Sequence, residues 1–361
     1  MKTSKFPSLR SQVLFLEDLP GIKKISLVLG FEPEQIVVIY DKKLYAHPNV
    51  KAWLKKFPLS YGVRAGEKLK DIDYFPLHLK KIMKVMGPSA PQNMCFVSLG
   101  GGSLGDFVGF LASIFKRGVP LIHIPTTFLA AMDSAHGGKT ALNVGTVKNQ
   151  VGSFYPATAV LIIQSLLQTL SKKQLQSAAG ELMKMGLIKG GELGSALQGQ
   201  SKEELKWLWD FLPQAIEAKY EVVERDPFET QGERQWLNLG HSLGHILEAH
   251  YGLAHGTAVA HGLVFSIQWS FHRGYLKAQD TEDMLHLVRE GTGISSPEEF
   301  FRQNKKMSLK QMSKYLNQDK KRIDRSHLSF VFLSGWGRPM RRKVTQESFF
   351  TEARRQGWIS F

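Results

Sequence analysis

Four short apolar segments, separated by stretches with helical periodicity, constrain the fold most strongly. They are residues 35–40 (QIVVIY), 94–99 (MCFVSL), 120–124 (PLIHI) and 159–163 (AVLII), each closed by turn residues or charges. Continuous apolar runs of this length are typical of strands that are buried on both faces of a parallel sheet. Between them lie segments such as DFVGFLASIFK (106–116), which has helical periodicity. The alternation predicts a doubly wound α/β domain.

The pattern changes near residue 166, where longer stretches rich in Leu, Lys, Glu and Gln begin. Residues 166–188 and 202–224 are the clearest examples, and both have the spacing of helices. A chain of 361 residues is long enough for two cores. We therefore expect an α/β, Rossmann-like domain over residues 1–165 and a mainly α-helical domain over residues 166–361.

The charge and composition narrow the classes of partner. The net charge of +15 is spread along the chain without interleaved aromatic residues, which favours small anions over nucleic acid. The apolar run near the N-terminus is short and is followed by Glu17 and Asp18, and no later run approaches the ~18 apolar residues of a membrane span. The single cysteine, Cys95, allows no internal disulfide, and a cytoplasmic location is expected.

A glycine-rich segment follows the second apolar run. Gly100, Gly102 and Gly105 have the G-x-G-x-x-G spacing, which lets backbone N–H groups approach a pyrophosphate at a helix N-terminus. No acidic residue follows Asp106 until Asp133, so the acid that usually binds the ribose is missing downstream. Asp41 and Glu67, both upstream, are the candidates for that role.

Residues 123–155 form a polar block after the third apolar run. The block is rich in Thr, Ser, Gly, Lys and Asn and lacks the periodicity of a surface helix, which indicates a loop. Loops at the carboxyl ends of parallel strands are where α/β proteins bind ligands. Lys139 and Lys148 could bind a carboxylate or phosphate, and Asn149 could bind a hydroxyl group.

Four histidines fall within residues 238–256. His241 and His245 are four residues apart and would share a helix face, where two imidazoles can bind one cation. An HExxH zinc-protease site is excluded because Ser242 follows the first histidine. The third ligand could be His255 or an acidic residue elsewhere. Glu181 is a candidate, although an exposed charge paired with Lys184 would give the same sequence pattern.

Taken together, several blocks resemble the 3-dehydroquinate synthase family of sugar-phosphate cyclases. The matching blocks occur in order between about residues 35 and 321: GEKLK, GGGSLGD, KRG, PTTFLAAMDSAHGGKT, VKNQVGSFY, GELMKMG, NLGHSLGHILEA, HGTAVAHG and DKK. Departures include Thr257, where the family usually has Glu, and His261, where it usually has Ile. Neither departure removes a residue that the resemblance implies as a ligand.

The resemblance implies a divalent metal ion, zinc or cobalt, bound by Glu181, His241 and His255. It also implies NAD⁺ over the glycine loop. The residues at cofactor-contacting positions are Asp41, Glu67, Lys70, Gly101, Gly102, Asp106, Thr126, Thr127, Lys139, Lys148 and Thr169.

The resemblance further implies a set of residues around an anionic sugar-phosphate substrate. They are Asp133, Lys139, Lys148, Asn149, Lys184, Lys219, Arg234, Asn238 and His245, together with Lys320 or Lys321. Arg117 corresponds to a family arginine that reaches the substrate of a neighbouring subunit, so a homodimer is implied. His250 has no implied role.

The implied reaction is that of the shikimate pathway of aromatic amino acid biosynthesis. 3-Deoxy-D-arabino-heptulosonate 7-phosphate is converted to 3-dehydroquinate and phosphate through transient oxidation, elimination, reduction and aldol closure. Alternatives are another cyclase, of the amino-dehydroquinate or 2-deoxy-scyllo-inosose type, and a glycerol-type metal-dependent dehydrogenase. A non-catalytic basic binding protein is the alternative from a different class.

Overall fold

The computed structural model describes residues 9–88, 93–145, 147–200, 205–318 and 326–360. It divides into two compact units, Met1–Leu170 and Ser171–Phe361, which are described one at a time. The domain boundary expected from the sequence, between residues 165 and 166, falls inside a short helix, α5 (Gln164–Leu167). Among the described residues, no helix combines the length and the apolar character needed to cross a membrane.

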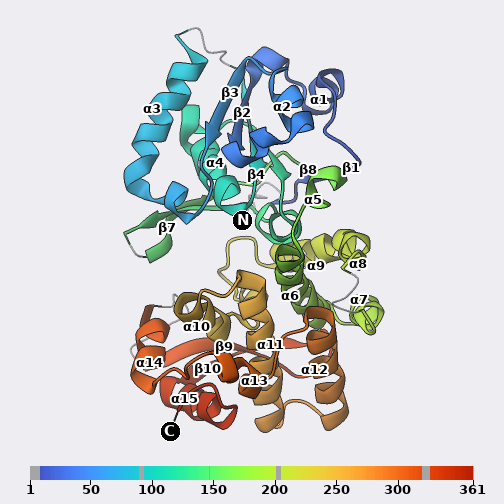
Figure 1. The fold of residues 1–361 in the computed structure, drawn as a ribbon, viewed down its shortest axis with the longest axis vertical. Coiled ribbons are helices and arrows are strands. Elements are labelled where there is room, and N and C mark those ends of the chain that lie inside the picture. Colours follow the sequence, from blue (N-terminus) through green and yellow to red (C-terminus); the bar gives the residue numbers. More distant parts are fainter. Residues whose placement is uncertain (1–8, 89–92, 146, 201–204, 319–325, 361) are drawn as a thin grey trace, which may run out of the picture. The chain divides into compact units, whose positions relative to one another are not determined.

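The first unit is built on a six-stranded parallel sheet with the order β1-β8-β5-β4-β2-β3 (Figure 1). The four predicted strands are confirmed to within one residue, whereas the first and third strands were not predicted. The strands are β1 (Gln12–Leu16), β2 (Ile36–Asp41), β3 (Leu59–Val63), β4 (Cys95–Gly100), β5 (Leu121–Pro125) and β8 (Ala159–Ile163).

Because the strands are parallel, their carboxyl ends share one edge of the sheet. Asp41 ends β2, Gly101 directly follows β4, and Thr126 directly follows β5. The sheet thereby gathers residues that are far apart in the sequence, at the edge where α/β proteins bind ligands.

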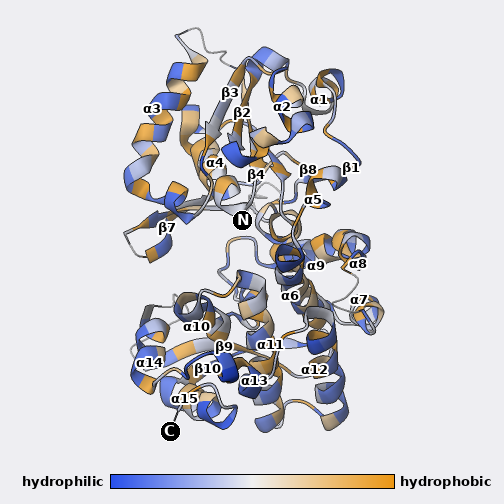
Figure 2. Cartoon of the chain, in the orientation of Figure 1, coloured by the Kyte–Doolittle hydropathy of each residue, from blue (hydrophilic) through white to orange (hydrophobic). Residues whose placement is uncertain are grey.

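Helices complete the first unit, and apolar side chains of β2, β4, β5 and β8 form a core with α1 and α2. The helix α3 is amphipathic, with Phe75, Ile82 and Met86 buried, and its hydrophobic and hydrophilic residues alternate in Figure 2. The helices are α1 (Ile22–Leu29), α2 (Pro48–Leu54), α3 (Phe75–Met86) and α4 (Gly102–Ile114).

The polar block expected to be a loop is only partly one. Residues Lys139–Val144 (β6) and Val147–Phe154 (β7) pair as an antiparallel hairpin with an irregularity between Leu142 and Val144. The prediction of a loop is wrong here because every residue of β7 is exposed or half-buried, so the strand carries no buried apolar pattern in its sequence. Cross-strand backbone hydrogen bonds, which sequence periodicity does not register, define this strand.

The second unit is mainly α-helical, as predicted, with a small two-stranded antiparallel sheet that was not predicted. The helices are α6 (Lys172–Lys189), α7 (Gly191–Leu197), α8 (Trp207–Asp210), α9 (Leu212–Arg225), α10 (His241–Tyr251), α11 (His255–His272), α12 (Ala278–Thr292), α13 (Pro297–Gln303), α14 (Leu309–Gln318) and α15 (Gln346–Arg355). The strands are β9 (His327–Leu333) and β10 (Pro339–Thr345).

The core of the second unit is aromatic. Phe265 and Trp269 of α11 pack against Phe330 and Phe332 of β9 and against Phe349 of α15. The strand β9 therefore buries its apolar side chains against α11. This packing makes α11 the central helix of the unit.

Candidate metal and cofactor sites

Three ligand-type side chains meet in the second unit. Glu181 on α6, His241 at the start of α10 and His255 at the start of α11 each place one donor atom within 4.8 Å of the others. Oε1 of Glu181 lies 3.5 Å from Nε2 of His241 and 3.2 Å from Nε2 of His255. Glu181 is only 1% exposed, and its Oε1 accepts no hydrogen bond of regular geometry. One carboxylate and two imidazoles around a buried, unsatisfied oxygen fit a divalent metal ion with open coordination positions.

Glycines explain how three separate helices come this close. A Cβ on Gly180 would lie 2.0 Å from the carbonyl oxygen of Gly256, so α6 and α11 touch backbone to backbone beside Glu181 and His255. A Cβ on Gly262 would lie 1.7 Å from the carbonyl oxygen of Gly240, the residue before His241. The small residues around each ligand therefore permit a helix approach that larger side chains would block.

Both histidines of the cluster have a second partner that orients the ring. Nδ1 of His255 donates to Oε2 of Glu248 at 2.8 Å, and Nδ1 of His241 donates to the carbonyl oxygen of Leu239 at 3.1 Å. Because these partners are acceptors only, each Nε2 is left to face Glu181. This arrangement is typical of metal-binding histidines. The family usually has a glutamate at position 257, where this chain has a threonine. In this chain the Glu248 carboxylate is the hydrogen-bond acceptor for His255.

The charges in the cluster are strongly coupled. Burial would raise the pKa of Glu181, but the Lys184 ammonium group and His255 outweigh it and hold that pKa well below its usual range. Burial would lower the pKa of His255, but its ion pair with Glu181 and its hydrogen bond to Glu248 raise that pKa. His255 must lose its proton to bind a metal ion, so the ion would replace that proton as the partner of Glu181.

The other two histidines of the segment differ from these. The exposed His245 has its ring centroid 5.3 Å from that of His241 and 6.1 Å from that of His255, so it borders the cluster. His250 points elsewhere: its Nδ1 lies 3.4 Å from the hydroxyl of Tyr315, and its ring packs against Tyr251. The structure thus brings three of the four imidazoles together.

Three cationic residues of the predicted substrate set are buried in the second unit. Lys184 forms an ion pair with Oε2 of Glu181, and Lys219 on α9 and Arg234 are 6% and 2% exposed. The alternative of an exposed Glu181–Lys184 pair is therefore wrong. Asn238, half-buried, ends the 3₁₀ helix that Arg234 begins.

A buried aspartate organises the loop that carries Arg234. The carboxylate of Asp226 accepts four backbone N–H groups, from Thr230 and Gln231 at Oδ1 and from Gly232 and Arg234 at Oδ2, over 2.8–3.2 Å. Burial would raise the pKa of Asp226, but these hydrogen bonds lower it. The guanidinium group of Arg234 also donates to the carbonyl of Pro227. These hydrogen bonds therefore fix the conformation of the loop around Arg234.

In the first unit, the glycine loop leads into α4, whose N-cap is Gly101. The side chain of Thr127 lies beside Gly101, and a Cβ on Gly102 would come 2.8 Å from the hydroxyl of Ser134. The N–H of Thr126 donates to the carbonyl of Gly100. The residues form a backbone-lined cradle at a helix N-terminus, which fits the pyrophosphate of a dinucleotide.

A polar network lies beside this cradle. Lys70, 3% exposed, donates to Oδ2 of Asp106 at 2.6 Å and to Oδ1 of Asn149. Asn143 accepts the N–H of Asn149 at 2.8 Å and donates to Oε2 of Glu67 at 3.1 Å. Three residues expected to contact the cofactor (Glu67, Lys70 and Asp106) are thus linked to one expected to contact the substrate, Asn149.

Other predicted residues of the first unit take different places. Lys139 and Lys148 are exposed on the hairpin, Asp133 is half-buried, and the hydroxyl of Thr169 donates to the carbonyl of Leu166. Asp41 accepts the N–H of Lys43 at the end of β2. Lys320 and Lys321 lie outside the described residues.

Backbone strain marks two of the predicted residues. Lys116, Arg117, Asn149 and Glu229 are the non-glycine residues with positive φ in the described part of the chain, with φ of 69° at Arg117 and 55° at Asn149. Such conformations cost about 1–3 kcal/mol and are common at functional sites. Strain at Arg117 and Asn149 therefore supports a functional role for both.

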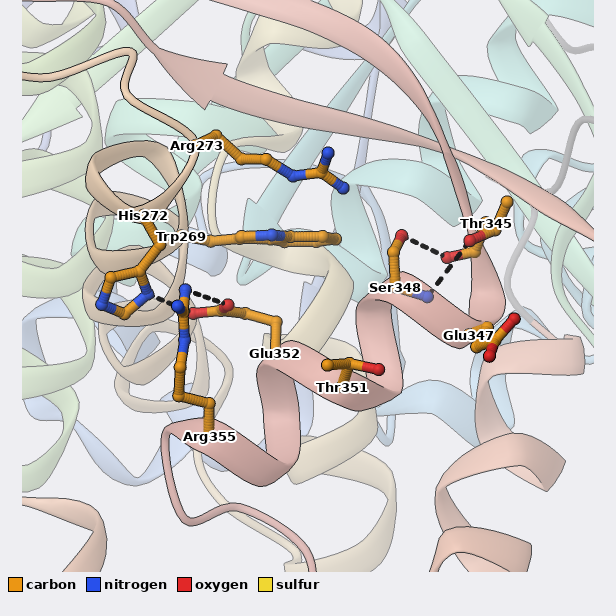
Figure 3. Close-up of a pocket in the computed structure, with 9 residues that line it drawn as sticks. All are labelled: Trp269, His272, Arg273, Thr345, Glu347, Ser348, Thr351, Glu352 and Arg355. Carbon is orange, nitrogen blue, oxygen red and sulfur yellow. Dashed lines mark hydrogen bonds and ion pairs between the residues drawn. The ribbon is translucent and has the colours of Figure 1, made fainter.

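A cavity of about 450 Å³ in the second unit lies between α11, β10 and α15. Figure 3 shows Arg273 over the ring of Trp269, and dashed lines that join the Glu352 carboxylate to His272 and to Arg355. The buried Glu352 carboxylate accepts from His272 at 2.8 Å and from Arg355 at 2.6 Å. No residue of the predicted sites lines the cavity, so we interpret Glu352 as a structural link between α11 and α15.

Comparison with known proteins identifies the class to which this fold and these clusters belong. The model of the 3-dehydroquinate synthase N-terminal domain matches residues 60–177, and the model of the C-terminal domain matches residues 178–322. A 3-dehydroquinate synthase of Xylella fastidiosa is 35% identical over 268 residues, which are 71% of this chain and 70% of the relative. The chain belongs to the 3-dehydroquinate synthase family.

Two further relatives agree with this assignment. A 3-dehydroquinate synthase of Pyrobaculum islandicum is 38% identical over 230 residues, and one of Xanthomonas campestris is 38% identical over 240. These matches cover 63% of this chain and only 66% and 64% of the relatives, slightly less than two thirds of their length.

Solved structures of cyclases share the fold. A 2-deoxy-scyllo-inosose synthase complexed with carbaglucose-6-phosphate, NAD⁺ and Co²⁺ superposes with a TM-score of 0.78 at 24% identity, covering 96% of both chains. A 2-epi-5-epi-valiolone synthase of Streptomyces hygroscopicus, with NAD⁺ and Zn²⁺ bound, gives 0.74 at 22% identity, covering 98% of this chain and 100% of that one. An iron-containing alcohol dehydrogenase of Thermococcus thioreducens is more distant, with a TM-score of 0.55 at 16% identity.

Sequence reasoning missed three residues that organise these clusters: Asn143, Asp226 and Glu248. The sequence did contain a signal for Glu248, because this residue lies seven residues after His241 and so on the same helix face. Asn143 and Asp226 had none, since their partners are backbone groups and, for Asn143, also the Glu67 side chain, which the fold brings close.

Proposed function

We propose that this chain is a 3-dehydroquinate synthase, which converts 3-deoxy-D-arabino-heptulosonate 7-phosphate to 3-dehydroquinate and phosphate. The observation that carries the proposal is the cluster of Glu181, His241 and His255 with the buried Lys184 beside it. Three ligands leave coordination positions for substrate oxygens, and the lysine suits an anionic substrate. The family assignment supports the same reaction.

The proposed cofactors are NAD⁺ and one divalent metal ion, zinc or cobalt. NAD⁺ would take up and return a hydride, and the metal would act as a Lewis acid on a substrate oxygen. Glu181, His241 and His255 would bind the metal, and the cradle at Gly101 and Gly102 would bind the pyrophosphate. The NAD⁺, Co²⁺ and Zn²⁺ in the cyclase structures named above support this choice.

The chain's own residues would hold the substrate by charge. Lys184, Lys219 and Arg234 are buried cations of the second unit, and the loop held by Asp226 fixes the direction of the Arg234 side chain. Lys139, Lys148, Asn149 and Asp133 of the first unit are proposed to contact the substrate as well. Buried guanidinium and ammonium groups bind carboxylate and phosphate strongly because little water competes for them.

The proposed assembly is a cytoplasmic homodimer in which Arg117 reaches the partner's substrate. Two observations support the dimer. Lys116 and Arg117 both adopt strained, left-handed backbone conformations in an exposed turn. In addition, the hairpin exposes apolar side chains, of which Val144, Val147 and Phe154 are 42%, 45% and 37% exposed.

The direct test is phosphate release from the heptulosonate phosphate with NAD⁺ and zinc, before and after chelation. We expect release that stops on chelation and returns with zinc. No release in the presence of metal would overturn the proposal. Inhibition by carbaglucose-6-phosphate, the ligand in the 2-deoxy-scyllo-inosose synthase structure, would favour that rival cyclase activity.

A matched pair of histidine variants tests the metal site. His255→Ala should abolish zinc retention after gel filtration and phosphate release, because it removes one of three ligands. His250→Ala should leave both unchanged, since that ring packs on Tyr315. Equal zinc content in the two variants would contradict the proposed ligand set.

A further inference from the structure

We propose that Asn143 is a positioning residue that holds Glu67, at the proposed cofactor site, and Asn149, at the proposed substrate site, in one arrangement. The inference rests on the proposed function, in which Glu67 contacts NAD⁺ and Asn149 contacts the sugar phosphate. All the residues belong to the first unit.

The contacts of Asn143 run in two directions. Its Oδ1 accepts the backbone N–H of Asn149 at 2.8 Å. Its Nδ2 donates to Oε2 of Glu67 at 3.1 Å and lies 3.4 Å from the carbonyl oxygen of that residue. One side chain therefore touches both Asn149 on β7 and Glu67 in the short helix Glu67–Lys70.

Only a primary amide of this size can make both contacts. An N–H group requires an acceptor, and a carboxylate requires a donor, so neither aspartate nor leucine can serve both neighbours. Because the Glu67 carboxylate only accepts hydrogen bonds, the NH₂ end of the Asn143 amide must face Glu67. At 7% exposed, Asn143 is shielded from water that could replace either contact.

The hairpin explains why this side chain points inward. The pairing of β6 and β7 is irregular between Leu142 and Val144, so Asn143 lies at a bulge, and it bridges to Asp71 instead of to β7. Bulges redirect side chains and are common next to active sites. Leu142 and Asn143 are consequently both buried although they are neighbours on a strand.

The contact with Asn149 holds a strained residue. Asn149 has a φ of 55°, and its side-chain oxygen accepts from Lys70, which also binds Asp106. Asn143 anchors the backbone of Asn149 while Lys70 anchors its side chain. Both the backbone and the side chain of Asn149 are therefore held by hydrogen bonds to buried side chains.

The test separates the two contacts with two variants of Asn143. Asn143→Asp keeps the acceptor for Asn149 but places a carboxylate against Glu67, so it should raise the Kd for NAD⁺ about tenfold and leave the KM for the sugar phosphate nearly unchanged. Asn143→Ser loses both contacts and should raise both values. Calorimetry gives the Kd, and phosphate release at saturating NAD⁺ gives the KM. Asn93→Asp, an exposed change in the same unit, is the charge control and should alter neither value.

A double-mutant cycle adds a readout that mere destabilisation would not produce. In the double variant Asn143→Asp/Glu67→Gln, the amide at position 67 donates to the carboxylate at position 143, so the hydrogen bond is kept with its direction reversed. The double variant should therefore bind NAD⁺ no more weakly than the single variant Glu67→Gln does. Additive losses would overturn the inference, as would an unchanged Kd for NAD⁺ in Asn143→Asp.

The failure of the proposed function would look different. A wild-type protein that binds NAD⁺ but releases no phosphate would refute the synthase assignment, while the cycle for NAD⁺ would still decide whether Asn143 positions Glu67. A fully active wild type whose variants of Asn143 behave normally would refute the present inference alone.

Discussion

His261 offers the sharpest test of the packing in the second unit. It is 3% exposed on α11, with its ring 5.5 Å from that of Phe300 and 5.4 Å from that of Trp358. The described residues provide its imidazole with no hydrogen bond, and burial lowers the pKa of His261 to about 4. Replacing it by leucine keeps the volume and removes the titrating group.

The magnitude follows from the shift in the pKa. Above pH 6.5 the ring is neutral in both the folded and the unfolded chain, and its titration contributes nothing. As the pH falls below 6.5, the unfolded chain takes up a proton that the folded chain refuses, so the folded state loses stability until about pH 4. At about 1.36 kcal/mol per unit, the loss between pH 7.5 and 5.0 is about 2 kcal/mol.

The assay is urea unfolding of wild type and His261→Leu at pH 7.5 and 5.0, followed by tryptophan fluorescence. Six of the seven tryptophans lie after residue 170, so the signal reports mainly on the second unit. We expect wild type to lose about 2 kcal/mol more than the variant on acidification. We also expect the variant to be more stable by about 1 kcal/mol at pH 7.5, because a buried polar ring is replaced by an apolar side chain. The buried His123 is present in both proteins and contributes equally to the pH dependence of their stability. An identical pH dependence in wild type and variant would therefore refute the reasoning about His261.

Three further predictions concern other features. Asp226→Ala should lower the free energy of unfolding by about 3 kcal/mol, since four backbone N–H groups, two of them in buried hydrogen bonds, lose their acceptor; it should also raise the KM for the sugar phosphate by releasing Arg234. Unchanged melting would contradict this. Gly262→Ala should lower the free energy of unfolding by about 3 kcal/mol or more, because the added Cβ meets a backbone carbonyl. Gly21→Ala, where the Cβ would enter open space and φ is −64°, should not, and thermal melts of both variants test this. Arg117→Gly should stabilise by about 1 kcal/mol by relieving a φ of 69° yet abolish phosphate release, and full activity would count against its proposed role.

The predicted strands differ from two of the unpredicted ones, β7 and β10, in what stabilises them. The strands at residues 36–41, 95–100, 121–125 and 159–163 are buried almost throughout, so continuous apolar runs revealed them. The hairpin strand at residues 147–154 is solvent-facing along most of its length, and β10 carries exposed Arg341, Arg342 and Lys343. Backbone pairing stabilises such strands, and pairing partners cannot be read from local hydrophobicity.

The sequence by itself determined the two-part organisation and the chemistry available to the chain. The apolar runs required a buried parallel sheet, and the resemblance of the motif blocks implied a carboxylate and two histidines as metal ligands. Spacing could not show that Glu181 lies within 3.5 Å of histidines 60 and 74 residues later. That distance depends on the glycine contacts that let α6, α10 and α11 touch. Tertiary structure alone also decided the partners of Asp226 and Asn143, because hydrogen bonds to backbone groups form only where the folded chain places both atoms.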